Sequence, residues 1–270
     1  MKPAAFDYAR CDTADEAVAL LAEHGENARV LAGGQTLVAA LNMRLAQPRI
    51  VVDISRCADL GSVALEGGML CVGASVTQAR LEHRPSLAGE VPMLPLAIPH
   101  ISHAQVRSRG TVCGSVAYAD PSAELPLVLV ALGGQVVLRS RRGQRVLAAD
   151  DFFRGMLQTA READELIEAV RFPLGGGRCA FHEFAERHGD FAIASVAVVA
   201  TQDGLRFAAG GVADRPRVAF WPRMNEADLD LAINDFAWEL DAQDDAHASA
   251  AYRRHLVREL GRRAVREALA

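Results

Sequence analysis

Along the first 55 residues, the spacing of the apolar positions is typical of a helix in some segments and of a strand in others. Helical spacing is expected at 13–24, where Thr13 and Glu16 have the form of a capping box, and again at 36–45. Strands are expected at 28–32 and 50–54. The first strand ends abruptly at the pair Gly33 and Gly34, so the pattern predicts a compact β-loop-α-β unit around these glycines.

Residues 63–172 show a different pattern, with strand pairs around glycine turns. Two hairpins are expected, at 63–73 and 135–148, and a further strand at 165–172. Three helical stretches and a glycine-containing segment complete this part of the chain, near 76–83, 93–100, 125–132 and 110–121. The order of elements predicts an α+β architecture.

A proline followed by three glycines marks the best candidate for a domain boundary. Pro173 ends the last strand, and the glycines occupy 175–177. Beyond them, strands are expected at 180–184, 194–201 and 205–212, and helices at 225–240 and 247–270. We therefore expect one domain at 1–174 and a second at 178–270.

Composition and charge narrow the classes of function. Half of the 270 residues are hydrophobic and 23% are charged, which suits one large or two moderate globular domains. The net charge of −5 argues against nonspecific binding of nucleic acid or of an anionic membrane. We expect no membrane insertion, because the longest apolar runs are far shorter than the roughly 20 residues that span a bilayer.

The cysteines and the first residues indicate a cytoplasmic protein. The N-terminal segment lacks the continuous apolar stretch of a secretory signal. Five widely spaced cysteines contain no close pair of the kind that zinc or iron–sulfur sites use: Cys11, Cys57, Cys71, Cys113 and Cys179. Free thiols are expected, and any iron or molybdenum is expected on another polypeptide.

Two glycine-containing segments, 31–37 and 110–115, have the composition needed to hold an anionic cofactor. Glycine lets backbone N–H groups converge on a diphosphate, and threonine and serine add hydroxyl donors. Neither segment has the spacing of a Walker loop or of a Rossmann turn. Valine at Gly33 or Gly114 is expected to abolish cofactor retention without loss of the fold. The alternative is that Gly33 and Gly34 form only a tight turn between a strand and a helix.

Three motifs together resemble the FAD-binding medium subunit of the molybdenum hydroxylases, the relatives of xanthine, carbon monoxide and nicotine dehydrogenases. They are AGGQTL at 32–37, QVRSRGTVCGSVAYADP at 105–121 and RHGDFA at 187–192, and GGVADRP at 210–216 extends the similarity. The resemblance implies a two-lobed FAD-binding domain of the vanillyl-alcohol-oxidase (PCMH) type, with lobes at about 1–55 and 56–174. It also implies a small α+β C-terminal domain of the carbon monoxide dehydrogenase flavoprotein type.

The resemblance further implies a set of FAD contacts. Two segments would clasp the diphosphate: Val30, Leu31, Ala32, Gly33, Gly34, Gln35, Thr36 and Leu37, and then Thr111, Val112, Cys113, Gly114 and Ser115. Ile101 and Ile167 would line the cofactor, and Phe191 would lie over the flavin ring. Glu124 would contact the ribityl and flavin region, although an acidic residue there also suits the first turn of a helix.

This sequence departs from the family pattern at several of these positions. Cys113 stands where glycine is usual, so its side chain would either crowd the diphosphate or face the core. Glu183 and Glu186 replace basic residues that often precede the third motif, which leaves His182 or Arg187 as substitutes for the positive charge near the flavin.

Two other groups of polar residues are weaker candidates. His100 and His103 have a spacing that suits one helix face, but further ligands are missing nearby, so we expect no metal site. Asp120 and Glu124 lack an accompanying nucleophile, and capping or cofactor contacts explain them better than acid–base catalysis. We assign no catalytic residue to this chain.

The leading hypothesis is an oxidoreductase subunit that transfers electrons through noncovalent FAD. Electrons would pass from molybdenum on a large subunit, through iron–sulfur clusters on a small subunit, to this FAD and then to an acceptor. The complex would be a heterotrimer or its dimer. The motifs do not specify the hydroxylated substrate or the acceptor. Alternatives are a self-contained flavin oxidase of a small alcohol or amine, and a nonenzymatic nucleotide-binding module.

Overall fold

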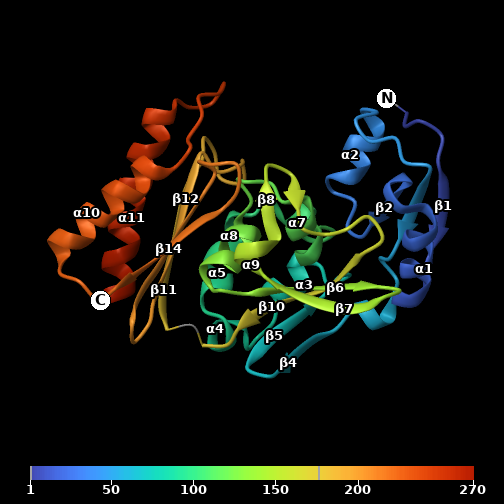
Figure 1. Ribbon diagram of the computed structural model, residues 1–270, viewed down its shortest axis with the longest axis horizontal. Coiled ribbons are helices and arrows are strands. Elements are labelled where there is room, and N and C mark those ends of the chain that lie inside the picture. The colour runs from blue at the N-terminus through green and yellow to red at the C-terminus, as the bar shows by residue number, and fades with distance from the viewer. Residues whose placement is uncertain (1, 176) are drawn as a thin grey trace.

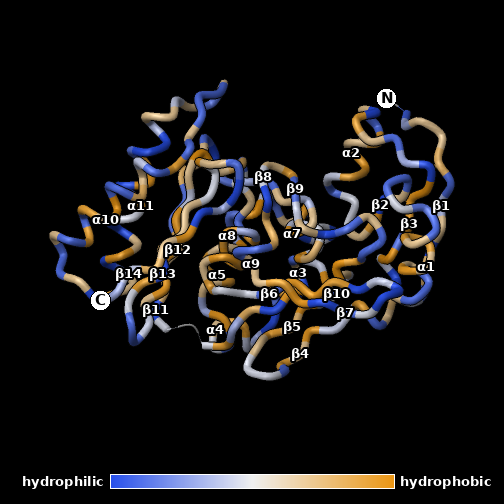
Figure 2. Tube along the Cα trace, in the orientation of Figure 1, coloured by the Kyte–Doolittle hydropathy of each residue, from blue (hydrophilic) through white to orange (hydrophobic). Residues whose placement is uncertain are grey.

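The computed structural model describes residues 2–175 and 177–270. Three larger sheets follow one another along the chain, from the N-terminal lobe on the right of Figure 1 to the C-terminal helices on the left, and β8 (Phe153–Gly155) and β9 (Gln158–Thr159) form a small fourth sheet. In Figure 2 the strands β10 (Leu166–Pro173) and β12 (Ala194–Ala200) are mainly hydrophobic, whereas hydrophilic residues are frequent in helix α11 (Ala250–Leu269).

The first sheet is parallel and has the order β1-β3-β2. Its strands are β1 (Asp7–Arg10), β2 (Ala28–Leu31) and β3 (Ile50–Asp53), with helices α1 (Ala14–His24) and α2 (Leu37–Asn42). The Thr13 hydroxyl accepts a hydrogen bond from the Glu16 N–H, which confirms the predicted cap. Strand β1 is missing from the sequence prediction because it is short and largely exposed and forms by pairing with β3.

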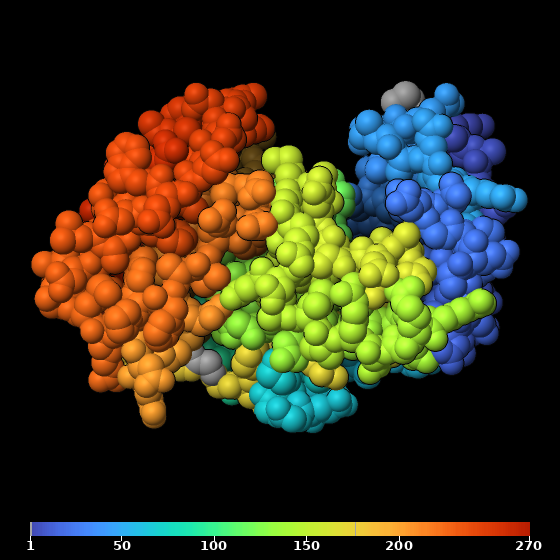
Figure 3. Space-filling model, in the orientation of Figure 1, coloured from blue at the N-terminus to red at the C-terminus, as the bar shows by residue number. Residues whose placement is uncertain are grey.

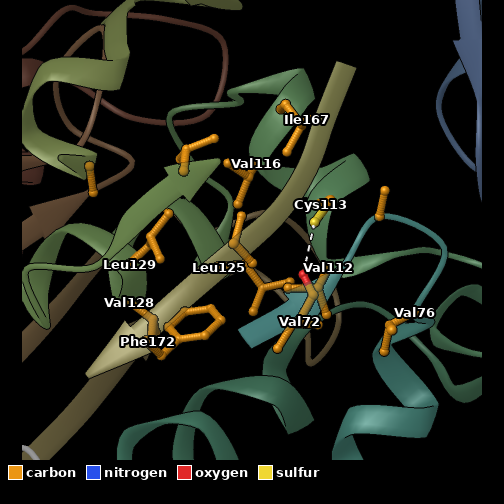
Figure 4. Close-up of a cluster of buried hydrophobic side chains, with 14 of the residues drawn as sticks. Val72, Val76, Val112, Cys113, Val116, Leu125, Val128, Leu129, Ile167 and Phe172 are labelled. Atoms are coloured by element: carbon orange, nitrogen blue, oxygen red, sulfur yellow. Dashed lines mark hydrogen bonds between the residues drawn. The ribbon is translucent and has the colours of Figure 1, made fainter. Parts of the chain in front are cut away.

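The second sheet is antiparallel and has the order β4-β5-β10-β6-β7. Both predicted hairpins are confirmed, β4 (Val63–Glu66) with β5 (Met69–Gly73) and β6 (Gln135–Ser140) with β7 (Gly143–Ala148). Strand β10 (Leu166–Pro173) lies between them and joins both into one sheet. Hydrophobic residues of β5 and β10 pack against helices α7 (Val112–Tyr118) and α8 (Glu124–Ala131) beside this sheet (Figure 4).

Helix α7 (Val112–Tyr118) lies within the glycine-containing segment expected at 110–121. The Thr111 hydroxyl accepts a hydrogen bond from the Gly114 N–H at 3.0 Å and caps this helix, which ends at Ala119 in the left-handed conformation. A glycine inside a helix costs about 1 kcal/mol relative to alanine. The cap and the burial of Val112 and Val116 offset this cost.

Helix α8 (Glu124–Ala131) is buried along its whole length. It lies between the second sheet and the third, so its apolar sequence faces protein on all sides. Shorter elements complete this part of the fold: α3 (Gln78–Glu82), α4 (Leu87–Glu90), α5 (Met93–Ala97), α6 (Ala104–Arg107), α9 (Ala149–Phe152), β8 (Phe153–Gly155) and β9 (Gln158–Thr159).

The third sheet is an antiparallel meander of β11 (Arg178–Phe184), β12 (Ala194–Ala200), β13 (Gly204–Gly210) and β14 (Arg217–Pro222). Helices α10 (Glu226–Glu239) and α11 (Ala250–Leu269) cover one of its faces (Figure 1). Along β12, Val196 and Val198 pack toward these helices, and Ala197 and Val199 join the core of the preceding region. Strand β14 is a further element absent from the sequence prediction.

The predicted boundary lies where the chain passes from the second sheet to the third. Strand β10 ends at Pro173, and β11 begins at Arg178. Gly176, the middle residue of the three glycines, lies outside the described residues, as does Met1 at the start of the predicted first domain. The division into 1–174 and 178–270 therefore stays a prediction. Within residues 2–175 and 177–270, no helix is long and apolar enough to cross a membrane.

Candidate functional site

A cleft of about 600 Å³ lies where the N-terminal lobe meets the rest of the molecule. Figure 3 shows a hollow between the blue N-terminal lobe and the green and yellow centre. Its lining comes from the loop after β2, from the start of α7, from β10 and from residues 189–191. The volume lies within the range of about 300–1,000 Å³ that is usual for small-molecule sites.

The loop between β2 and α2 presents backbone donors to this cleft. Gly34 has φ of +75°, a conformation that glycine adopts readily. In the described part of the chain, the N–H groups of Gly34, Gln35 and Thr36 have no acceptor within the protein. Adjacent free N–H groups of this kind suit an anionic group such as a diphosphate.

Gly33 holds this loop against the second glycine-containing segment. A Cβ atom on Gly33 would overlap the carbonyl oxygen of Arg109 and lie 2.8 Å from the Cα atom of Gly110. Because Gly33 has no side chain, two backbone segments about 75 residues apart in sequence come into close contact beside the cleft. Gly33 and Gly34 therefore form the turn between β2 and α2, and this turn presents free N–H groups to the cleft.

The second segment contributes the start of α7. Thr111, Cys113, Gly114 and Ser115 line the cleft, whereas Val112 is fully buried in the core and does not. In the first segment every predicted contact except Leu31 lines the cleft: Val30, Ala32, Gly33, Gly34, Gln35, Thr36 and Leu37.

The Cys113 side chain faces the core. Its Sγ donates a hydrogen bond to the Val72 carbonyl oxygen at 3.4 Å, as Figure 4 shows. Burial raises the pKa of this thiol to about 12. A cysteine is therefore accommodated at a position where the family usually has glycine, and the thiol is poorly suited to react with a flavin.

The remaining predicted contacts converge on the same cleft from distant parts of the sequence. Ile101 and Ile167 are buried and supply apolar lining. Phe191 is 70% exposed and reaches the cleft from the loop between β11 and β12. The N-terminal lobe, the second sheet and the C-terminal region thus all contribute to one site.

Glu124 is the first residue of α8 and is 7% exposed. Burial, together with the nearby charge of Asp120, raises the pKa of its carboxyl group to about 7. A helix N-terminus alone would lower that pKa, so burial dominates here. Near neutral pH this group is able either to donate or to accept a hydrogen bond in the cleft.

The two glutamates that replace basic residues have different surroundings. The Glu183 side chain is 3% exposed, whereas Glu186 is exposed. His182 places its Nε2 atom 2.9 Å from a carboxylate oxygen of Glu267 on α11. Neither His182 nor Arg187 lines the cleft, so neither supplies a positive charge to its lining.

Several residues that line the cleft belong to no motif, so the sequence alone does not identify them. Gln78 places a buried Oε1 atom, which lacks a partner in the described chain, beside the cleft. Arg29 and Arg161 also line it, and burial and the charge of Arg29 lower the pKa of Arg161. The position of Arg29 next to the first glycine segment is a weak signal, whereas Gln78 and Arg161 are found only through the fold.

The chemistry of the lining fits FAD. Free N–H groups suit its diphosphate, the orphan Gln78 oxygen suits a hydroxyl donor, and apolar side chains suit its rings. Among residues 2–175 and 177–270, no group of three His, Cys, Asp or Glu side chains could hold a metal ion.

Comparison with known proteins agrees with this chemistry. Residues 4–175 match the family described as the FAD binding domain in molybdopterin dehydrogenase. The chain is 38% identical to the nicotine 6-hydroxylase medium subunit of Paenarthrobacter nicotinovorans, over 99% of both chains. It is 41% identical to the caffeine dehydrogenase subunit beta of Pseudomonas sp. (strain CBB1), over 74% of this chain and 68% of that one.

Solved structures extend the similarity to the whole fold. A chain of carbon monoxide dehydrogenase from Hydrogenophaga pseudoflava superposes with a TM-score of 0.94 and 29% identity, over 100% of this chain and 99% of that chain. A chain of quinoline 2-oxidoreductase from Pseudomonas putida 86 gives 0.92 and 32%, over 99% and 98%. The α+β fold with a PCMH-type FAD-binding region is thereby confirmed. The chain belongs to the family of FAD-binding medium subunits of the molybdenum hydroxylases, which are oxidoreductases with FAD as the cofactor of this subunit.

Proposed function

We propose that this chain conducts electrons between a partner's iron–sulfur clusters and an acceptor, by way of FAD held in the cleft. A large molybdenum subunit would hydroxylate the substrate, and a small subunit would hold the clusters, in a heterotrimer or its dimer. The observation behind the proposal is the junction of the two glycine-containing segments, which places free N–H donors beside apolar lining. FAD supplies a carrier that accepts electrons singly and releases them in pairs.

Each group of residues has a distinct part in binding. The N–H groups of Gly34, Gln35 and Thr36 would hold the diphosphate, and Gln78 Oε1 would accept a hydrogen bond from a hydroxyl group. Ile101 and Ile167 would exclude water from the rings. These contacts account for binding and orientation, whereas chemistry on the organic substrate is assigned to the molybdenum subunit.

The names of the relatives support an assembly of several subunits. The names of both relatives, a medium subunit of nicotine 6-hydroxylase and a subunit beta of caffeine dehydrogenase, refer to one subunit of an enzyme that has several. We include a cytoplasmic location in the proposal. The free thiols of all five cysteines fit a reducing compartment.

The test compares the FAD-loaded chain alone with the chain added to a purified complex that lacks it. An artificial acceptor and candidate substrates such as purines, pyridines and aldehydes are supplied in both cases. We expect no substrate oxidation by the chain alone and restored acceptor reduction in the complex. Chain stripped of FAD is the matched control and should restore nothing.

Turnover of an organic substrate by the chain alone would contradict the proposal and favour a self-contained flavin oxidase. Failure of the FAD-loaded chain to restore acceptor reduction in the complex would also contradict it.

A further inference from the structure

A buried arginine joins the last helix to one end of the third sheet. Arg253 lies near the start of α11, which packs against β11 and β12 (Figure 1), and it is 6% exposed. Its Nη1 atom donates hydrogen bonds to the carbonyl oxygens of Ile193 and Gly211, at 2.7 and 2.6 Å. Its Nη2 atom donates to a carboxylate oxygen of Asp245 at 2.5 Å. The buried guanidinium therefore has a charged partner and also bridges two backbone segments.

The two carbonyl groups lie just beyond the paired parts of neighbouring strands. The pair of Ser195 and Gly210 is the last one in the ladder between β12 and β13 at this end. The carbonyl groups of Ile193 and Gly211 are buried next to it and require a donor. A neutral donor would satisfy them, and a buried ion pair can often be replaced by apolar residues without loss of stability. Stability alone is therefore a weak explanation for a charged side chain at Arg253.

The two backbone segments held by Arg253 are connected with the FAD cleft. Ile193 follows two residues after Phe191, which lines the cleft. Gly211 belongs to the motif at 210–216, and its N–H donates a hydrogen bond to the carbonyl oxygen of Pro121 at 2.7 Å. The residue before Pro121 also lines the cleft. Arg253 therefore ties the segment of Phe191 to a residue that is itself fixed to the FAD-binding region.

The Phe191 side chain depends on its backbone for its position. It is 70% exposed, so packing of the side chain itself does little to fix it. On one side of it, the Ile193 N–H donates to a carbonyl oxygen of β11 at 2.8 Å, and the Ile193 carbonyl oxygen accepts from Arg253. On the other side, Gly189 has φ of +87°, and a Cβ atom there would lie 2.8 Å from the Cε1 atom of His103. The segment is held at both ends, and Arg253 supplies the contact from the last helix.

Asp245 holds the guanidinium of Arg253 in place. Its other carboxylate oxygen accepts hydrogen bonds from the N–H groups of His247 and Ala248, both at 2.9 Å. The hydrogen bond from Arg253, followed by these two, holds the pKa of Asp245 well below its usual value. The pair therefore stays charged at neutral pH, and the direction of the guanidinium is fixed by a carboxylate that is itself anchored to the backbone.

We propose that Arg253 is a positioning residue for the FAD site, and that it holds the Phe191 segment where bound FAD meets it. The inference rests on the proposed function, because it requires FAD in the cleft. Arg253 does not line the cleft, so it acts through the backbone of Ile193 and then through Phe191. The C-terminal region thereby contributes to cofactor binding from a helix outside the site.

The test titrates FAD into the FAD-free full chain and follows flavin fluorescence. The double variant Arg253→Met with Asp245→Asn buries no unpaired charge, so we expect it to fold. It should bind FAD several-fold more weakly than the wild type. In a Phe191→Ala background the same two substitutions should weaken binding by less than about twofold, because their effect passes through Phe191. At saturating FAD, the visible circular dichroism of the double variant should differ from that of the wild type and approach that of Phe191→Ala.

Two further variants separate positioning from stability. Arg253→Lys keeps the charge but has one donor nitrogen in place of two, so it should also lose FAD affinity, and it carries the test if the double variant does not fold. Arg262→Met is the matched control, because Arg262 lies on the same helix and pairs with Asp230 at 3.1 Å but does not line the cleft. It should bind FAD like the wild type even if its thermal midpoint falls.

Three results would overturn the positioning role while the proposed function stands. The first is wild-type FAD affinity and circular dichroism in the Arg253 variants. The second is an equal loss of affinity with and without the Phe191 side chain, since Arg253 would then act by another route. The third is unfolding of both Arg253 variants, which would make the residue a stability element. If the wild-type chain binds no FAD, the proposed function itself fails, and the positioning role fails with it.

Discussion

The carbonyl oxygen of Arg109 occupies the space that a Cβ atom on Gly33 would need. This contact joins the first glycine-containing loop to the segment that precedes α7. It also changes the expected effect of substitution at Gly33, because the constraint comes from the protein itself as well as from the ligand.

Gly33→Val should abolish FAD retention and also lower the thermal midpoint. The valine side chain would force apart two backbone segments, and overpacking of this kind costs about 1–3 kcal/mol or more. We still expect the fold to survive, but with a lower stability than the wild type. Flavin absorbance after gel filtration and thermal melting measure the two effects.

Gly89→Val is the matched control, because a Cβ atom there has no neighbour within 4 Å. It should retain FAD and most of the stability. A Gly33→Val protein that binds stoichiometric FAD and melts like the wild type would contradict the role given to the Arg109 contact.

Phe191→Ala should weaken FAD retention without lowering the stability of the FAD-free chain. The side chain is 70% exposed, so its removal loses little buried area, yet it lies at the cleft. Titration of the FAD-free chain with FAD, followed by flavin fluorescence, should show several-fold weaker binding. Phe220→Ala is the control, since Phe220 is 52% exposed on β14 and does not line the cleft. Equal FAD affinity in Phe191→Ala and the wild type would remove Phe191 from the site.

FAD should be released completely by acid precipitation, because Cys113 is not available for a covalent bond. Its thiol is buried in the core, and burial raises its pKa to about 12. Iodoacetamide should label Cys113 in the native chain far more slowly than after unfolding, as peptide mass spectrometry would show. Flavin retained in the acid pellet of the wild type but not of Cys113→Ser would show instead that the thiol is attached to it.

The stability of the FAD-free chain should fall as the pH rises from about 5 to about 8. Burial raises the pKa of Glu124 to about 7 and that of Glu183 to about 8, so in this range the folded chain binds protons that the unfolded chain has released. The full contribution is present below the unfolded pKa of each carboxyl and is lost as the pH passes the folded value. Urea unfolding at pH 5.5 and 8.5 measures the difference.

The double variant Glu124→Gln with Glu183→Gln should flatten this dependence by about 4–6 kcal/mol between the two pH values, since one pKa unit corresponds to about 1.4 kcal/mol. Glu186→Gln, at an exposed position, should keep the wild-type slope. An equally steep slope in the double variant would mean that these two carboxyls ionise normally in the folded chain.

Elements with strong local signals were predictable from the sequence. The cap at Thr13 defines the start of α1, glycine turns define both hairpins, and the continuous apolar run identifies α8. Most of the residues predicted from the glycine-containing segments also line the cleft, as does Phe191. Capping, turn formation and hydrophobic periodicity act over a few residues, so they are visible in any short window of the sequence.

The tertiary structure alone decided which of these parts meet. It inserted β10 between the two hairpins, formed β1 and β14 by pairing, and made a helix of the segment after Thr111. It brought Gln78 and Arg161 into the cleft, turned the Cys113 side chain toward the core, and placed Glu183 beside His100. These outcomes depend on burial and on contacts between residues far apart in the sequence, so no local pattern encodes them.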